Sequence, residues 1–186
     1  MALPTASSER QLKHRRSIDV QVYVRGDGCW DVDARLIDVR PKETRLASGT
    51  RAPDEPIHEM LLRLVVDDAF GVRQAGSQTF AMPFPGQCDG FEDPYARLVG
   101  LNLMHGFRQG VRERLGGVLG CTHLTELTHV LPTAVVQALA EDAFDPNAAG
   151  TERPFPIDRC QAMRSDGPTV RTYFARWYRA PLTTDH

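Results

Sequence analysis

Residues 17–38, with the sequence SIDVQVYVRGDGCWDVDARLID, decide the fold. Apolar residues occupy every second position in the run from Ile18 and again in the run from Trp30. Such alternation is typical of a strand that buries one face. The glycines at Gly26 and Gly28 between the two runs indicate a turn. The stretch therefore predicts a β-hairpin.

The pattern changes twice further along the chain. Residues 41–56 contain three prolines and many charges, and they predict a loop. An apolar run over residues 57–66 predicts a third strand, and residues 72–81, which follow a turn at residues 67–71, are expected to return as a fourth. Apolar residues then recur with helical spacing, and they predict helices over residues 95–114 and 122–142.

Strands followed by packed helices predict an α+β fold. We expect an antiparallel sheet of about four or more strands, formed mostly by residues 17–81, with the two helices packed on one face. Residues 1–16 are small and polar, which predicts a flexible N-terminal tail, although their basic end could also grip phosphate. Residues 17–181 are expected to form a single domain, in which residues 169–174 could add an edge strand.

The composition of the chain argues against several classes of protein. The 186 residues include 22 basic and 24 acidic side chains, so a general polycation for nucleic acid is not expected. No apolar run approaches the length of about 18 residues that a membrane span needs. The four cysteines form no Cys-x-x-Cys pair, and a cytoplasmic protein with reduced thiols is expected. The expected partner is a small molecule, and a homo-oligomer is also possible.

Reactive side chains gather at the start of the second predicted helix. Cys121, His123, Glu126 and His129 lie within nine residues. His123 and Glu126 share a helical face, and Cys121 lies where the helix dipole favours a thiolate. The alternative is structural, because a cysteine can pack as a small apolar residue and a glutamate can cap a helix.

Further candidates lie in the predicted sheet. His58 begins the third strand, directly after the long loop, where it could act in proton transfer or lie at the surface. Asp38 falls on the apolar face of the second strand, so it needs a partner or a function. Trp30 could form the wall of a substrate pocket. Arg63 alternates away from the apolar face and could bind substrate or face solvent.

Several segments resemble a known family. They are Arg25-Gly26-Asp27-Gly28-x-Trp30-Asp31-Val32, Ile57-His58-x-Met60 and Gly116-Gly117-x-x-Gly120-Cys121-Thr122-His123-Leu124-x-Glu126-Leu127. Together they resemble a bacterial family of small proteins that is known only as a domain of unknown function. The resemblance implies a soluble protein of bacteria that degrade aromatic and other small organic compounds. It also favours His58, Cys121, His123 and Glu126 as functional residues.

Three functions are compatible with these residues. The first is an enzyme without an organic cofactor, a lyase or isomerase in which His123 and His58 transfer protons and Glu126 orients or charges His123. A hydrolase with Cys121 as nucleophile is a variant of it. The second is a zinc site built on Cys121, His123 and His58, with Cys88 as a further ligand. The third is a non-enzymatic domain for ligand binding or assembly.

Overall fold

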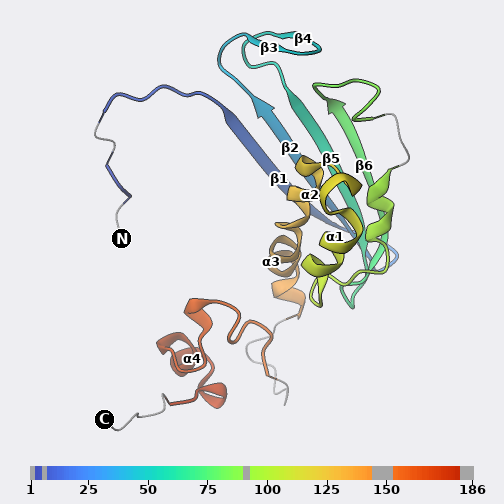
Figure 1. The fold of residues 1–186 in the computed structure, drawn as a ribbon. Coiled ribbons are helices and arrows are strands. Elements are labelled where there is room, and N and C mark those ends of the chain that lie inside the picture. The colour runs from blue at the N-terminus through green and yellow to red at the C-terminus, as the bar shows by residue number, and fades with distance from the viewer. Residues whose placement is uncertain (1–2, 6–7, 90–92, 144–152, 181–186) are drawn as a thin grey trace. The chain divides into compact units, whose positions relative to one another are not determined.

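A computed structural model describes residues 3–5, 8–89, 93–143 and 153–180 of the chain (Figure 1). The chain forms two compact units, Met1–Ala138 and Leu139–His186. This division differs from the single domain expected over residues 17–181. The first unit carries the sheet and the candidate site.

The first unit is built on a four-stranded antiparallel sheet, as the sequence predicts. Its order is β1-β2-β5-β6, with strands β1 (Arg15–Val24), β2 (Trp30–Val39), β5 (His58–Val66) and β6 (Val72–Ala81). The expected loop over residues 41–56 contains a small two-stranded sheet, β3 (Thr44–Leu46) and β4 (Gly49–Arg51). β1 begins two residues before the predicted start, so Arg15 and Arg16 belong to the sheet and not to a flexible tail.

One face of the sheet carries the buried core side chains. Val32, Ala34 and Leu36 of β2 and Leu62 and Leu64 of β5 are fully buried. Each buried valine or leucine side chain stabilises the fold by about 1.5–3 kcal/mol. The helices of the first unit lie over this face (Figure 1), and α2 (Thr122–Thr128) packs on β2 and β5. This arrangement confirms the predicted α+β class.

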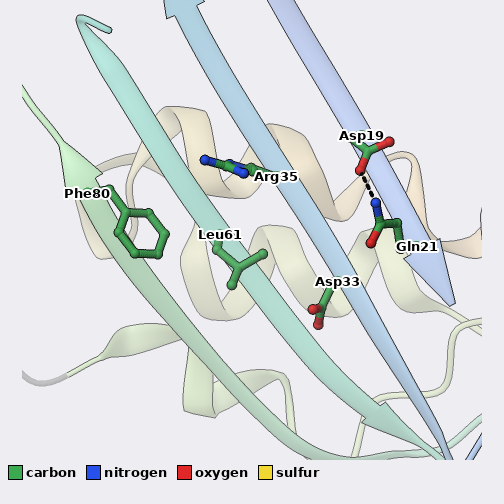
Figure 2. Close-up of a pocket in the computed structure, with 6 residues that line it drawn as sticks. All are labelled: Asp19, Gln21, Asp33, Arg35, Leu61 and Phe80. Carbon is green, nitrogen blue, oxygen red and sulfur yellow. Dashed lines mark hydrogen bonds between the residues drawn. The ribbon is translucent and has the colours of Figure 1, made fainter. Parts of the chain in front are cut away.

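The opposite face of the sheet is open to solvent. A shallow hollow of about 260 Å³ lies on it (Figure 2), lined by Asp19, Gln21, Asp33, Arg35, Leu61 and Phe80. A second hollow of about 350 Å³ extends over β5 and β6. On β1 and β2 the lining side chains are the polar half of the alternating pattern, while Leu61 and Phe80 add apolar surface.

The helix predicted over residues 95–114 is wrong in its first half. The structure has a 3₁₀ turn, η1 (Pro94–Leu98), and then a helix, α1 (Phe107–Leu115). Gly100 between them has φ +84°, a left-handed conformation that ends helical geometry. The intervening backbone pairs with β6 instead, because Gly100 donates to the carbonyl of Val72 and Val72 donates to that of Leu101 (both 2.9 Å).

The helix predicted over residues 122–142 is also divided. α2 ends at Thr128 and α3 (Leu131–Ala143) follows after two residues, with a 3₁₀ turn, η2 (Gly117–Leu119), before α2. Pro132 has no N–H to donate to the carbonyl of Thr128, so it cannot continue α2. It fits the first turn of α3, where a helix needs no such donor.

The second unit contains short helices. They are η3 (Gln161–Met163), α4 (Pro168–Tyr173) and η4 (Ala175–Trp177). The suggestion of an edge strand over residues 169–174 is therefore wrong. Pro168 is a favourable first residue for α4. The alternation of apolar residues after it obscures this helix signal in the sequence. In the described part of the chain, no helix combines the length and the apolar character that a membrane crossing requires.

Candidate functional site

Asp38 lies near the end of β2, on the face that the helices cover. It is 2% exposed. The register places it directly between two strands, opposite Arg16 of β1 and opposite His58 of β5. A carboxylate in this position loses nearly all of its water, so it is stable only if side chains replace those hydrogen bonds.

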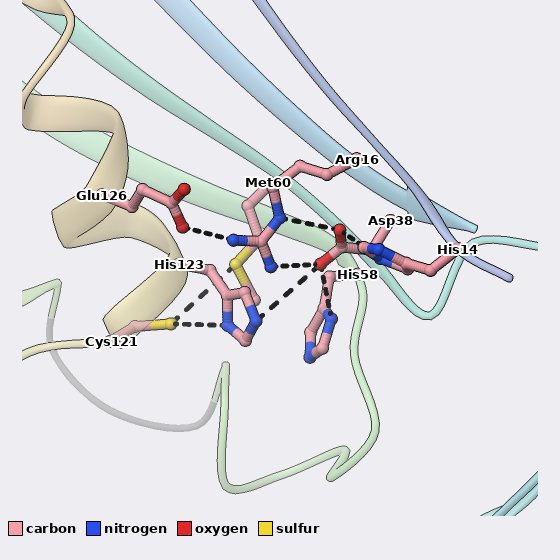
Figure 3. Close-up of polar contacts among 8 residues, drawn as sticks. All are labelled: His14, Arg16, Asp38, His58, Met60, Cys121, His123 and Glu126. Atoms are coloured by element: carbon pink, nitrogen blue, oxygen red, sulfur yellow. Dashed lines mark hydrogen bonds and ion pairs between the residues drawn. The ribbon is translucent and has the colours of Figure 1, made fainter. Parts of the chain in front are cut away.

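Three side chains bind the Asp38 carboxylate (Figure 3). Arg16 donates from Nε to Oδ1 and from Nη2 to Oδ2, both at 2.8 Å. His14 Nε2 lies 2.9 Å from Oδ1, and His58 Nδ1 lies 3.1 Å from Oδ2. Burial raises the pKa of Asp38, but the hydrogen bonds and charges of Arg16 and His14 outweigh it, so the pKa is lowered overall. The group is therefore a buried anion with a full set of donors.

His123 reaches the same carboxylate from α2. Its Nε2 lies 3.8 Å from Asp38 Oδ2, which is too far for a hydrogen bond. Its ring lies against that of His58, with ring centres 3.8 Å apart and planes tilted by 31°. We call His14, Arg16, Asp38, His58 and His123 the Asp38 cluster.

The surroundings of the two stacked imidazoles lower the pKa of both rings and so favour their neutral form. Burial lowers the pKa of His58, and the charge of His123 lowers it further, against the opposing effect of Asp38. Burial also lowers the pKa of His123, and Arg16 adds to this shift, while Asp38 and Glu126 oppose it. With Nδ1–H of His58 donated to Asp38, its Nε2 is left as a base.

Tyr95 fixes the start of α2 and so the position of His123. Its buried hydroxyl accepts from the N–H of Cys121 (3.0 Å) and contacts the carbonyl of Cys121 and the hydroxyl of Thr125 (both 2.8 Å). Burial is the main cause that raises the pKa of Tyr95 to about 12. A Cβ at Gly120 would lie 2.8 Å from the carbonyl oxygen of Leu115, so the close approach needs glycine.

Cys121 and Glu126 border the Asp38 cluster without binding Asp38. Cys121 Sγ lies 3.8 Å from His123 Nδ1 and 3.9 Å from Met60 Sδ. Glu126 forms an ion pair with Nη1 of Arg16. The expected role of Glu126 is to orient or charge His123; its carboxylate is bound by Arg16, and its charge acts to raise the pKa of His123. The structure brings His58, Cys121, His123 and Glu126 into one place, as predicted.

Two predicted substrate-binding residues lie elsewhere. Trp30 is at the other end of β2 from Asp38, opposite Val24 and Val66. Trp30 and Asp38 are eight positions apart along the strand, about 26 Å. Arg63 lies on the open face and donates from Nε and Nη2 to the carboxylate of Asp33, at 2.6 and 2.5 Å. Of the three substrate-binding candidates, only Asp38 lies in the cluster.

Sequence reasoning missed His14 and Arg16, which it placed in the flexible tail. The hairpin contains the signal that could have found them. If the strands pair around Gly26-Asp27-Gly28, Arg16 falls opposite Asp38, as observed. The buried carboxylate of Asp38 needs a partner, and the basic run directly before Ser17 supplies one.

A metal ion could take ligands from the cluster. In the described part of the chain, one atom each of Asp38, His58 and His123 lie within 4.8 Å of one another, whereas the predicted zinc ligands Cys88 and Cys121 do not join this group. Two imidazoles on one tetrahedral zinc would hold their ring centres about 5 Å apart, since each centre lies about 3 Å from the metal. The observed 3.8 Å is closer. Arg16 also occupies both oxygens of Asp38, so the residues as they lie fit zinc poorly.

Fold and site together define an α+β protein with a buried carboxylate beneath two histidines in ring contact. Residues 14–137 match the family described as proteins of unknown function, DUF2889. This match covers more than half of the chain, so the chain belongs to that family, which confirms the resemblance. The matched residues include the whole Asp38 cluster. No curated protein and no solved structure matches the chain.

Proposed function

We propose that this protein is a small-molecule enzyme without an organic cofactor, a lyase or an isomerase that works by proton transfer at the Asp38 cluster. The observation that carries the proposal is the ring contact of His58 and His123 over one buried carboxylate. The two rings come from β5 and α2, 65 positions apart in the sequence. Local structure alone does not produce such a contact, and paired neutral imidazoles suit acid–base work near neutral pH.

The geometry supports a specific division of roles. His58 Nε2 takes a proton from substrate, and the imidazolium that forms is stabilised by Asp38 through its Nδ1–H. His58 then returns the proton to another substrate atom in an isomerase, or to the leaving group in a lyase. His123 donates its own N–H to the developing negative charge or exchanges the proton. Arg16 keeps Asp38 ionised throughout, since its hydrogen bonds lower the pKa of that carboxyl group.

The substrate class and the location are inferred from other features. An aromatic or related small organic compound fits the bacteria with which the family is associated. All four cysteines are free thiols, which suits the reducing cytoplasm.

Isotope exchange tests the proposal before the full reaction is known. Small carbon acids, aromatic compounds among them, are incubated with the protein in deuterium oxide, and incorporation of deuterium into substrate is followed by NMR. A proton-transfer enzyme should label its substrate, and the His58→Gln and His123→Gln variants should not. A compound that is converted without labelling, at an unchanged rate in both variants, would refute the assignment.

A divalent metal site is the second candidate, because Asp38, His58 and His123 offer three ligand atoms close together. Elemental analysis of the purified protein separates the two. About one zinc per chain, lost together with activity on chelation, would favour a metal enzyme. Activity that persists in metal-free protein favours the proton-transfer enzyme.

A further inference from the structure

We infer that the protein forms a dimer in which strand β1 pairs, antiparallel, with β1 of a second copy. β1 is ten residues long and lies at the edge of the sheet, paired in the described structure with β2 alone. Its free edge therefore presents a row of unpaired backbone donors and acceptors. Such an edge is a template for another strand.

The opposite edge of the sheet shows what a protected edge looks like in this protein. Val72 of β6 exchanges backbone hydrogen bonds with the segment at Gly100 and Leu101, and the N–H and hydroxyl of Ser77 donate to Asp93. The pairing of β6 with β5 is also interrupted by register shifts. β1 has neither feature, since its register with β2 runs without a shift from Arg15 to Val24.

The side chains of β1 leave apolar surface at this edge. Residues 17–24 contain one charge, Asp19, and no proline or lysine, which are the residues that usually blunt an edge strand. Ile18 is 38% exposed and Val24 is 81% exposed. A long, regular and apolar edge of this kind is expected to be covered in the native assembly.

The sequence of β1 is complementary to itself in one register. With the two-fold axis at Val20, Ile18 of each copy lies opposite the other copy's Val22, and Asp19 lies opposite the other copy's Gln21. Asp19 and Gln21 share the open face, where Gln21 Nε2 already donates to Asp19 Oδ2 (2.8 Å) in the single chain (Figure 2). This register pairs residues 16–24 and places no like charges opposite each other within the strand.

Neighbouring registers are less favourable. An axis at Asp19 would place the two Asp19 carboxylates opposite each other, which destabilises a strand pair. An axis at Gln21 would leave only residues 18–24 paired. Charge and length therefore both favour the axis at Val20, and they identify the occupant of the edge as a second copy of this chain.

Substitutions at Gln21 test the register in both directions. Light scattering with size-exclusion chromatography should give twice the mass of the chain, and sedimentation analysis should give the dissociation constant. Gln21→Lys adds two attractive pairs with Asp19 and should tighten the dimer, whereas Gln21→Asp adds two repulsive pairs and should weaken it. Each change should be about 2- to 30-fold. Gln74→Lys and Gln74→Asp on β6 are the matched controls and should change nothing.

Hydrogen exchange supplies a readout that does not depend on the variants. Amides within residues 16–24 should exchange more slowly as the concentration of the wild-type protein rises. A monomer at every concentration would overturn the inference. Weakening by both Gln21 variants would also overturn it, because it would place Gln21 opposite itself. Circular dichroism of each variant establishes that a loss of dimer is not a loss of folding.

Discussion

Asp38 and Asp33 lie five residues apart on the same strand, and each accepts hydrogen bonds from two nitrogens of one arginine. Their surroundings differ because odd and even positions of a strand point to opposite faces. The Asp38 side chain is 3% exposed and meets two more imidazoles, while the Asp33 side chain is 15% exposed and its partner Arg63 is 56% exposed on the open face. The same pair of residue types therefore has two different energetic roles.

The difference shows where a charged pair has consequences. An exposed arginine–carboxylate pair contributes little, because water and salt compete for both partners. A buried carboxylate depends on its partners, because its own hydration has been lost. Asp38 therefore ties β1 and β5 to β2, and Asp33 forms a more exposed pair on the open face.

The largest expected effect concerns the two histidines. His123→Ala should lower turnover by about 10²–10⁴-fold with the fold retained, because it removes a positioned proton-transfer group. His129→Ala is the matched control, since His129 is exposed and follows the last residue of α2. Rates are compared on the substrate found by isotope exchange. Equal rates for the two variants would show that the cluster has no catalytic role.

The next effect compares the two carboxylates directly. Asp38→Asn should lower the free energy of unfolding by about 2–4 kcal/mol, because a buried charged acceptor is lost and Arg16 is left with fewer partners. Asp33→Asn should lower it by at most about 1 kcal/mol. Urea denaturation of both variants measures the difference. Similar losses for the two would mean that burial does not distinguish them.

A smaller effect appears as a dependence on pH. His58 and His123 have a lower pKa in the folded chain, so the unfolded chain binds more protons in mild acid. The free energy of unfolding should therefore fall as the pH drops below about 6.5. Asp38 adds a second loss below its ordinary value of 3.8, since its pKa is also lowered.

Variants test whether His58 and His123 cause the loss of stability below about pH 6.5. Thermal melts between neutral pH and pH 5 should show a smaller slope for the double variant His58→Gln/His123→Gln than for wild type. Asp33→Asn should keep the wild-type slope. An unchanged slope in the double variant would show that other groups cause the loss.

The smallest effect is expected at Cys121. Cys121→Ser should retain activity within about tenfold of wild type, because the proposed proton transfer does not use the thiol. Serine also keeps the size of the side chain and the N–H that Tyr95 binds. Near-total loss of turnover, measured beside His123→Ala, would instead indicate a nucleophilic thiol.

The four-stranded sheet could be predicted from the sequence because alternation marks β1 and β2 and an apolar run marks β5, whereas β3 and β4 are too short to leave such a pattern. The helices were harder, since Gly100 and Pro132 interrupt patterns that are otherwise periodic. His58 and His123 could be chosen as candidates because both lie at the starts of elements. Their convergence could not be derived, since it depends on how α2 packs on the sheet.

The strand register of β1 has a consequence for insertions and deletions in the gene. Arg16 reaches Asp38 only because the turn around Gly26-Asp27-Gly28 has its present length. Losing one codon there and slipping the pairing by one residue would move every side chain of β1 to the other face. The hairpin could still form, but Arg16 would point away from Asp38. The number of residues in this solvent-exposed turn is therefore constrained in the same way as the charged residues that the turn aligns.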